Sequence, residues 1–215
     1  MLVGSASGVS FDYDRGGHQP GSEASMQIRG TGSLNGGSPY VVIDGFPGDM
    51  NRLNPDDIES ISILKGSNAA ALYGSQGANG VVLITTKKGK NGKATVSVSS
   101  GITFENRLLK PELQYKYGSE NGTKESWSTT AGDYDDTFVD DFFRTGTNLL
   151  NTVSISGGTD RTKAYFSYGN VSATGIIDQH TYNRNNLTFK QSTKLFNDRL
   201  TIGSSVILSA EKTKN

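Results

Sequence analysis

The 215-residue chain contains no cysteine, and this absence excludes disulfide bonds and thiolate metal sites. No stretch approaches the 18 consecutive apolar residues of a membrane-spanning helix, so that kind of membrane segment is excluded as well. Basic and acidic residues balance at 21 each, which leaves no net charge to attract nucleic acid or anionic lipid. We therefore expect no nucleic-acid partner.

Proline and hydrophobic residues are also scarce, at 5 residues and 33% of the chain. Disordered chains share such a composition, but nine tyrosines, nine phenylalanines and many β-branched residues argue against disorder. The 27 glycines indicate many turns. These counts predict β structure in which half of each strand is polar.

Short apolar runs separated by turn signals organise the first ninety residues. They predict one compact α+β unit, with strands near 26–29, 40–44, 60–65 and 80–87 and short helices near 55–59 and 67–73. Asn54 followed by Pro55 is typical of a helix N-terminus. Ser67 is expected to cap the second helix and Gly74 to end it in the left-handed conformation. The alanines at 69–71 have small side chains, so this helix is expected to pack closely against a neighbouring part of the protein.

From Lys93 onward the pattern changes to strict alternation of apolar and polar residues. In the first run one face carries Ala94, Val96, Val98, Ile102 and Phe104, and the other carries Thr95, Ser97, Ser99, Gly101 and Thr103. Four similar runs follow, with apolar faces at Val153 and Ile155; Ala164, Phe166 and Tyr168; Leu187 and Phe189; and Leu200, Ile202, Val206 and Leu208. Alternation of this kind is found in soluble β-sandwiches and in membrane barrels alike.

Three features favour a barrel of the outer-membrane type. The first and last runs are about 11 residues long, the length that a tilted strand needs to cross a bilayer. Their polar faces carry serine, threonine, asparagine and glycine, which suits a wet lumen. Long and short connections also alternate, as they do in such barrels. Five strands are too few to close a barrel, and the N-terminus lacks a signal peptide, so we expect the natural chain to extend in both directions.

The first half resembles the plug domain of SusC/RagA-type TonB-linked outer-membrane transporters of Bacteroidetes. The resemblance lies in MQIRGTGSLNGGSPYVVIDGFP and in LNPDDIESISILKGSNAAALYGSQGANGVVLITTKKGKNGK. The matching positions are Ile58–Ile61, Leu64–Gly66, Ala69–Gly74 and Ala78–Lys87, preceded by Leu2, Gly4, Ala6, Gly8 and Val9 in LVGSASGV. Farther on, VSISGGTDRTKAYFSYGNVSATGII is similar to early barrel strands of the same family.

This resemblance implies a domain division and an activity. Residues 1–90 would be a plug domain without its N-terminal part, and residues 91–215 the first five strands or so of an outer-membrane β-barrel. The family imports nutrients actively: TonB pulls on an N-terminal TonB box, a SusD-like lipoprotein covers the extracellular side, and the substrates are oligosaccharides or peptides. The alternative is a soluble or surface-displayed β-rich binding module without transport activity.

No motif in the sequence predicts an enzyme. The GTGSLNGG stretch lacks the ending of a phosphate loop, and no nucleophile, zinc or carboxylate signature is present.

The acidic loop 133–141 has calcium-type ligands, but it lacks an EF-hand register, so a solvated loop is expected. His18 and His180 have no partners at metal or triad spacing and are interpreted as surface residues. Aromatic residues of the long loop, Trp127 with Tyr115, Tyr117 and Tyr134, either form a local core or stack on sugars. We therefore expect no cofactor and name no catalytic, metal or substrate-binding residue.

Overall fold

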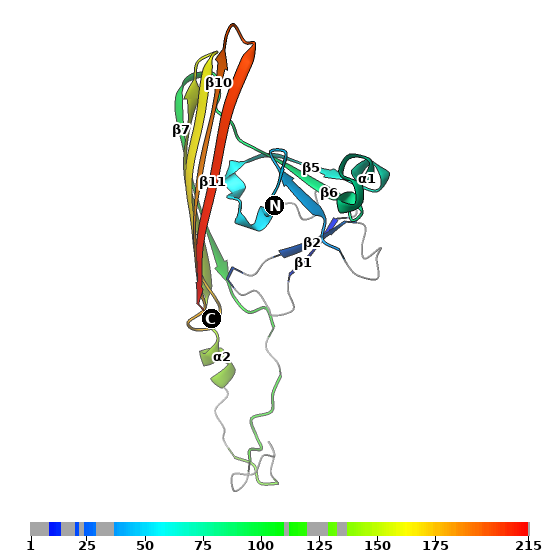
Figure 1. Ribbon diagram of the computed structural model, residues 1–215. Helices are drawn as coiled ribbons and strands as arrows, with labels where there is room; N and C mark the ends of the chain where they lie inside the picture. The colour runs from blue at the N-terminus through cyan, green and yellow to red at the C-terminus, as the bar shows by residue number, and fades with distance from the viewer. Residues whose placement is uncertain are drawn as a thin grey trace.

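The computed structural model describes residues 9–13, 20–21, 24–28, 37–109, 112–119, 129–132 and 137–214. These residues form a small mixed domain, residues 9–86, which lies against one face of a tall five-stranded sheet that we call the wall (Figure 1). No helix of the described residues is long and apolar enough to cross a membrane.

The small domain is built on a four-stranded mixed sheet in the order β4-β3-β6-β5. Its strands are β3 (Tyr40–Ile43), β4 (Phe46–Pro47), β5 (Ile58–Leu64) and β6 (Val81–Thr86). The β3–β6 pair is parallel and the other two pairs are antiparallel. A separate antiparallel pair, β1 (Val9–Tyr13) and β2 (Ala24–Ile28), joins this sheet through side chains: Met26 and Ile28 pack on Val82 and Ile84 in one core. The four predicted strands are confirmed, and β1 and β4 are additional.

Helical structure in the small domain is short. It consists of the 3₁₀ turns η1 (Met50–Arg52), η2 (Pro55–Asp57) and η3 (Gly74–Gly77) and the helix α1 (Ser67–Tyr73). The helix predicted near 55–59 is only the turn η2, because β5 already begins at Ile58. Asn54 caps this turn as predicted, with its side-chain oxygen accepting from the Asp56 N–H.

The predictions for α1 are confirmed in part. Ser67 is not the cap: Gly66 holds that position with φ 59°, and no side chain caps the helix. The sharp bend from β5 into α1 requires this positive φ, which glycine adopts at little cost. Gly74 ends the helix, also with φ 59°, but its ψ of −140° differs from the left-handed helical conformation that was predicted. Of the three alanines, only Ala69 is buried, whereas Ala70 and Ala71 are exposed.

Gly80 is a place where the small-domain core tolerates no side chain. Its φ is +91°, and an added Cβ would lie 2.8 Å from Ile28 Cδ1 and 3.2 Å from the Leu64 carbonyl oxygen. Backbone strain of this kind costs about 1–3 kcal/mol, so Gly80→Ala is expected to lower the free energy of unfolding of the small domain. Urea titration monitored by hydrogen exchange measures the loss. Gly45→Ala is the matched control, because Gly45 has φ +94° but open space around it. Equal losses in both variants would contradict the close packing at Gly80.

The wall is an antiparallel sheet in the order β11-β10-β9-β8-β7. Its strands are β7 (Gly92–Glu105), β8 (Gly146–Gly158), β9 (Thr162–Thr174), β10 (Thr181–Leu195) and β11 (Leu200–Lys214). All five predicted runs are strands, and the first and last of them, predicted at about 11 residues, are 14 and 15 residues long. The alternating pattern underestimates strand length because main-chain pairing continues past the apolar stripe into segments that are polar on both faces, such as Asn183–Asn185.

The connections of the wall differ at its two ends. Residues 159–161 and 196–199 form tight turns at one end, which we call the short-turn end. Residues 106–145 and 175–180 connect the strands at the other, the long-loop end, where α2 (Phe138–Phe142) also lies. Figure 1 shows the short turn between β10 and β11 at the top and α2 at the bottom. The predicted alternation of long and short connections is confirmed.

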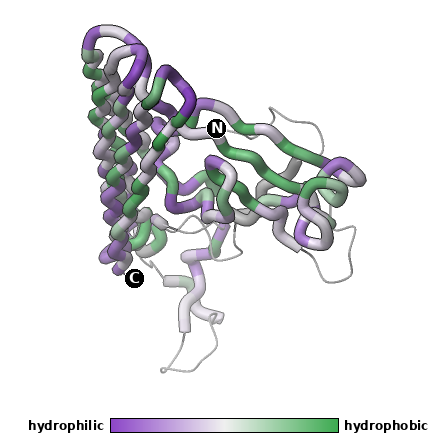
Figure 2. The backbone as a smooth tube through the Cα atoms, turned by 45° about the horizontal axis from the view of Figure 1, so that its top comes forward, coloured by the Kyte–Doolittle hydropathy of each residue, from purple (hydrophilic) through white to green (hydrophobic). Residues whose placement is uncertain are grey.

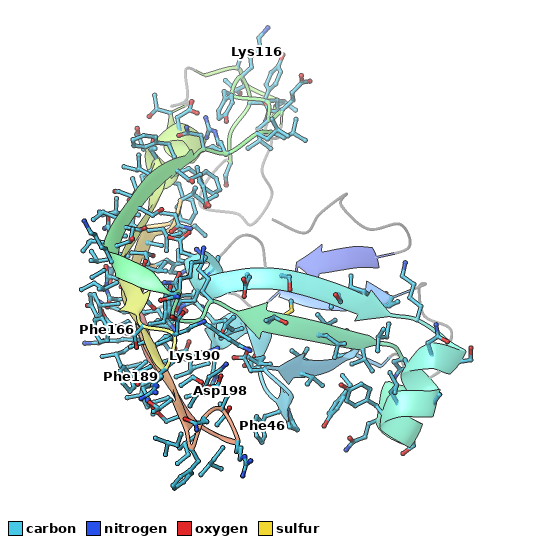
Figure 3. All side chains as sticks on the ribbon, turned by 90° about the horizontal axis from the view of Figure 1, so that it is seen from above. Phe46, Lys116, Phe166, Phe189, Lys190 and Asp198 are labelled. Atoms are coloured by element: carbon cyan, nitrogen blue, oxygen red, sulfur yellow. The ribbon has the colours of Figure 1, made fainter. Side chains whose placement is uncertain are left out.

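The two faces of the wall are opposite in character. The outer face, away from the small domain, exposes a band of apolar side chains that includes Val98, Val153, Tyr168 and Leu208. The inner face buries polar side chains against the small domain: Thr152, Ser167, Asn186, Thr188 and Lys190. Figure 2 shows the alternation along the strands, and Figure 3 shows Phe166 and Phe189 on the outer face and Lys190 on the inner face. The wall is therefore apolar outside and polar inside, the reverse of a soluble sheet over a core.

Candidate functional site

Asp57 is the centre of the contact between the small domain and the wall. It is the last residue of η2, and only 1% of its surface is exposed. Three wall hydroxyl groups donate to its carboxylate: Tyr165 to Oδ1 at 2.8 Å, and Ser167 and Thr188 to Oδ2, each at 2.7 Å. Within the described residues no lysine or arginine forms an ion pair with Asp57. A buried carboxylate is thus held by neutral donors alone.

Asn54, at the start of the same turn, makes the next contact. Its Nδ2 donates to Thr152 Oγ1 on β8 at 3.2 Å, while its Oδ1 accepts from the Asp56 N–H. Gly169 on β9 makes room for this side chain, since an added Cβ there would lie 2.5 Å from Asn54 Nδ2. One asparagine therefore both caps η2 and fixes it to the wall.

Two β10 side chains bind main-chain carbonyl groups of the preceding turn, η1. Asn186 Nδ2 donates to the Arg52 carbonyl oxygen at 2.6 Å, and the Arg184 guanidinium donates to the carbonyl oxygen of Asn51. These carbonyls lie at the end of a short 3₁₀ turn, where no helical partner is available. The segment 51–57 is consequently bound to β8, β9 and β10 along its whole length.

A second carboxylate, that of the half-buried Asp44, binds the wall through a lysine. Asp44 and Gly45 form the two-residue turn between β3 and β4, both with positive φ, as such hairpins require. Lys190 Nζ lies 2.5 Å from Asp44 Oδ2, and the same oxygen accepts from Thr86 Oγ1 at 2.8 Å. Oδ1 accepts from the Thr86 N–H at 3.0 Å. The wall lysine therefore joins a turn and a strand end of the small domain.

Acidification is expected to weaken this contact. Burial raises the pKa of Asp44, but the hydrogen bonds from Lys190 and Thr86 and the Lys190 charge outweigh it, so the pKa lies below its ordinary value of 3.8. A depressed pKa means that the charged carboxylate contributes stability above pH 3.8 and loses that contribution as pH falls through the folded-state pKa. The urea concentration that detaches the small domain, measured on either side of pH 3.8, should fall with pH. Asp44→Asn should flatten this dependence, and an unchanged slope would contradict the assignment.

A cavity of about 1130 Å³ lies beside these contacts, between the small-domain segment 43–53 and the inner faces of β9 to β11. Its wall side includes the small residues Ser192, Gly203 and Ser205, the lysines Lys163 and Lys190, and the apolar Ile207 and Leu208. The cavity extends from the docked segment toward the short-turn end.

The residues considered as sites from sequence lie elsewhere. In the acidic loop, Asp133, Asp135 and Asp136 are outside the described residues, while Asp140 forms an ion pair with Arg107 and Asp141 accepts from Thr137 Oγ1 at 2.9 Å. His180 is half-buried in the turn between β9 and β10, and His18 is not described. In the part of the chain that the structure describes, no three His, Asp or Glu side chains are grouped as metal ligands.

The aromatic cluster is described only in part. Trp127 and Tyr134 lie outside the described residues. Tyr115 is half-buried, and Tyr117 is more exposed and pairs with Ala131 through an isolated β-bridge. Whether the cluster is a local core or a sugar-binding surface therefore stays a prediction.

Comparisons with known proteins show which family this architecture resembles. Residues 1–81 match the family model described as TonB-dependent Receptor Plug Domain. The chain is 32% identical to the TonB-dependent receptor SusC of Bacteroides thetaiotaomicron over 216 residues, which cover 93% of the chain and 21% of SusC. It is 34% identical to a TonB-dependent receptor of Formosa agariphila over 197 residues, which cover 85% of the chain and 19% of that receptor. The chain thus spans about a fifth of the length of the curated relatives it matches.

Solved structures share the fold. The chain superposes on the RagAB peptide transporter with a TM-score of 0.81 at 23% identity, covering 99% of this chain and 28% of that one. The siderophore receptor PirA from Acinetobacter baumannii gives a TM-score of 0.62 at 19% identity, covering 96% and 28%. The predicted fold class, an α+β plug domain followed by antiparallel strands of an unclosed barrel, is confirmed. The chain therefore belongs to the TonB-dependent receptors of the SusC/RagA type, proteins of the outer membrane of Gram-negative bacteria.

Proposed function

We propose that this chain is part of an active nutrient importer in which the small domain blocks the lumen that the wall helps to enclose. The observation that carries the proposal is the polarity of the wall: the small domain docks on a hydroxyl-rich inner face while the outer face exposes an apolar band. Within the described residues no second sheet covers that band. The boundary between plug and barrel then falls near residues 90 and 91, between the end of β6 and the start of β7.

The partners and cargo follow from the family and are part of the proposal. TonB supplies the force that rearranges the plug, acting on a TonB box, and a SusD-like surface lipoprotein covers the extracellular side. The cargo is an oligosaccharide or a peptide. Support comes from the relatives, since one is named SusC and another is described as a peptide transporter. Because the relatives are receptors and transporters, we propose no catalytic activity.

Uptake by cells that carry the full-length receptor tests this function. Labelled oligosaccharide and peptide mixtures are offered to cells with and without the receptor and with and without TonB. Import that requires both proteins supports the proposal. Import that persists without TonB, or binding without import, would refute it.

Cysteine labelling separates the importer from a β-rich binding module. The chain has no cysteine of its own, so single cysteines at Val96, Val98, Ser97 and Ser99 give a clean signal in a cysteine-free full-length background. We expect a lipid-soluble thiol reagent to label only positions 96 and 98, whose side chains lie on the outer face. Labelling of those two positions by a membrane-impermeant reagent would favour the binding module.

A further inference from the structure

The cavity beside the docked segment carries more positive than negative charge. Its charged lining residues are Arg52, Lys88, Lys163 and Lys190 against Asp44 and Asp49. Both acidic residues are already paired, Asp44 with Lys190 and Asp49 with Arg52. Lys88 and Lys163 form no ion pair within the described residues. Two cations without a counter-charge therefore line this space.

A close backbone contact brings these two lysines together. Gly89 lies against β9, where an added Cβ would collide with the Ala164 backbone. Lys88 precedes Gly89 and Lys163 precedes Ala164, so the two lysine main chains are neighbours at one side of the cavity. Like charges at short range repel each other, and a negative group that lies between them is attracted by both. This side of the cavity is therefore suited to an anion.

The chain segment that contains Gly89 is fixed to the wall by two further contacts. The Lys90 N–H donates to Ser156 Oγ on β8 at 3.1 Å, and the Asn91 amide donates to Asp160 in the turn between β8 and β9. The lysine side of the cavity therefore keeps its place on β8 and β9. The opposite side is the segment 43–53 of the small domain, which has to move before cargo can pass.

The inner face next to Lys163 offers space and a further donor. Ser192 on β10 pairs with Lys163, and Gly203 on β11 pairs with Ser192. A Cβ added at Gly203 would meet only the Gln191 carbonyl oxygen, at 3.6 Å, so packing within the wall does not require a glycine there. The volume of about 1130 Å³ is enough for a short stretch of cargo, since ligand pockets commonly measure about 300–1,000 Å³. Across three strands, a cation, a hydroxyl group and open space thus follow one another.

We propose that this cavity binds carboxylate groups of the cargo, with Lys88 and Lys163 as the cations that hold them and Ser192 as a hydroxyl donor. The proposal rests on the proposed function, and it narrows the cargo to acidic peptides or acidic oligosaccharides. The site lies toward the short-turn end, which faces the periplasm in barrels of this kind. Cargo therefore meets these cations as it leaves the lumen.

Protection of a single cysteine tests this site without measuring transport. Ser205 lines the cavity and is exposed, so Ser205→Cys in the purified full-length receptor, cysteine-free elsewhere, should react with an uncharged methanethiosulfonate. At about 10 mM, at least one of two acidic probes, tetraglutamate and tetragalacturonate, should slow this reaction at least about fivefold, as occupancy of a millimolar site requires. The stronger of the two probes identifies the cargo as peptide or sugar. Tetraglutamine with blocked termini has no side-chain charge and should not slow the reaction.

Substitution of the lysines separates binding by charge from simple obstruction. Lys88→Gln with Lys163→Gln should abolish the protection, whereas Lys88→Arg with Lys163→Arg should preserve it. The matched control, Lys212→Gln with Lys214→Gln, removes the same charge from two exposed lysines of β11 near the long-loop end and should leave the protection unchanged. Gly203→Phe should abolish the protection by filling the cavity while both of its unpaired lysines remain.

Three results would overturn the carboxylate site: no protection by either acidic probe, equal protection by tetraglutamine, or protection that survives the loss of both lysines. None of them depends on import. The site can therefore fail in a receptor whose import requires TonB, and it can be confirmed in a receptor that imports nothing.

Discussion

Arginine in place of Val98 is expected to destabilise the membrane-embedded receptor by about 2–4 kcal/mol, the cost of a charge on the lipid face of a barrel near the bilayer midplane. Val98 lies in the middle of β7, and 73% of its surface is exposed on the outer face. It pairs with Val153 of β8 in the apolar band. Reversible urea unfolding of the full-length receptor from lipid bilayers measures the loss.

The neighbouring position provides the control. Ser97 pairs with Ser154 on the inner face, so Ser97→Arg places the charge in a polar environment and should cost much less. The same arginine one residue apart then reports which face meets lipid. Equal destabilisation by both variants would show that the outer face of β7 is not in contact with the membrane.

Asp57→Ala is expected to detach the small domain from the wall while leaving it folded. The change removes the acceptor of three wall hydroxyls, and hydrogen bonds to a charged group contribute about 1.5–3 kcal/mol each. A loss of at least about 3 kcal/mol at the contact follows. The two apolar clusters of the small domain do not include Asp57, so its internal packing should persist. The full-length variant should open a conducting pore in planar bilayers at a lower urea concentration than the unmodified receptor.

Asp56→Ala is the matched control for this prediction. Asp56 is adjacent and carries the same charge, but it makes no side-chain hydrogen bond to the wall among the described residues. It should leave the urea dependence of the pore nearly unchanged. Asp57→Asn should fall between the two alanine variants, because its amide keeps one acceptor oxygen. A pore that opens at the same urea concentration in Asp57→Ala would disprove the anchoring role.

The local parts of this contact could be predicted from sequence, and the long-range parts could not. Asn54 and Pro55 specify a helix start by their own chemistry, and the structure has a capped turn there. The two aspartates that follow read as charges favoured at the positive end of a helix. Asp57 is instead buried by partners 108, 110 and 131 residues away, and no local pattern encodes such distances.

The wall shows the same division. Alternation assigns each residue of β7 to a face, since side chains of a strand point to opposite sides in turn. Alternation does not show that Lys190 contacts the small domain, because a lysine on a polar strand face looks in sequence like an ordinary solvent-exposed charge. Its function as the partner of Asp44 depends on how the turn between β3 and β4 meets β10, and only the folded structure brings them together. The only indications in the sequence were that Lys190 lies on the polar face of its strand and that an acidic turn, at Asp44, precedes it in the chain.

The order of the chain has a consequence for biogenesis. The contact face of the small domain, from Asp44 to Asp57, is synthesised more than a hundred residues before Thr188 and Lys190. During that interval its carboxylates have no wall to bind and must remain hydrated. Two charged groups on this face, instead of apolar ones, keep the early folded domain soluble and prevent it from adhering to other chains while it waits. A charged contact face thus suits an assembly in which its partners on β10 are synthesised last.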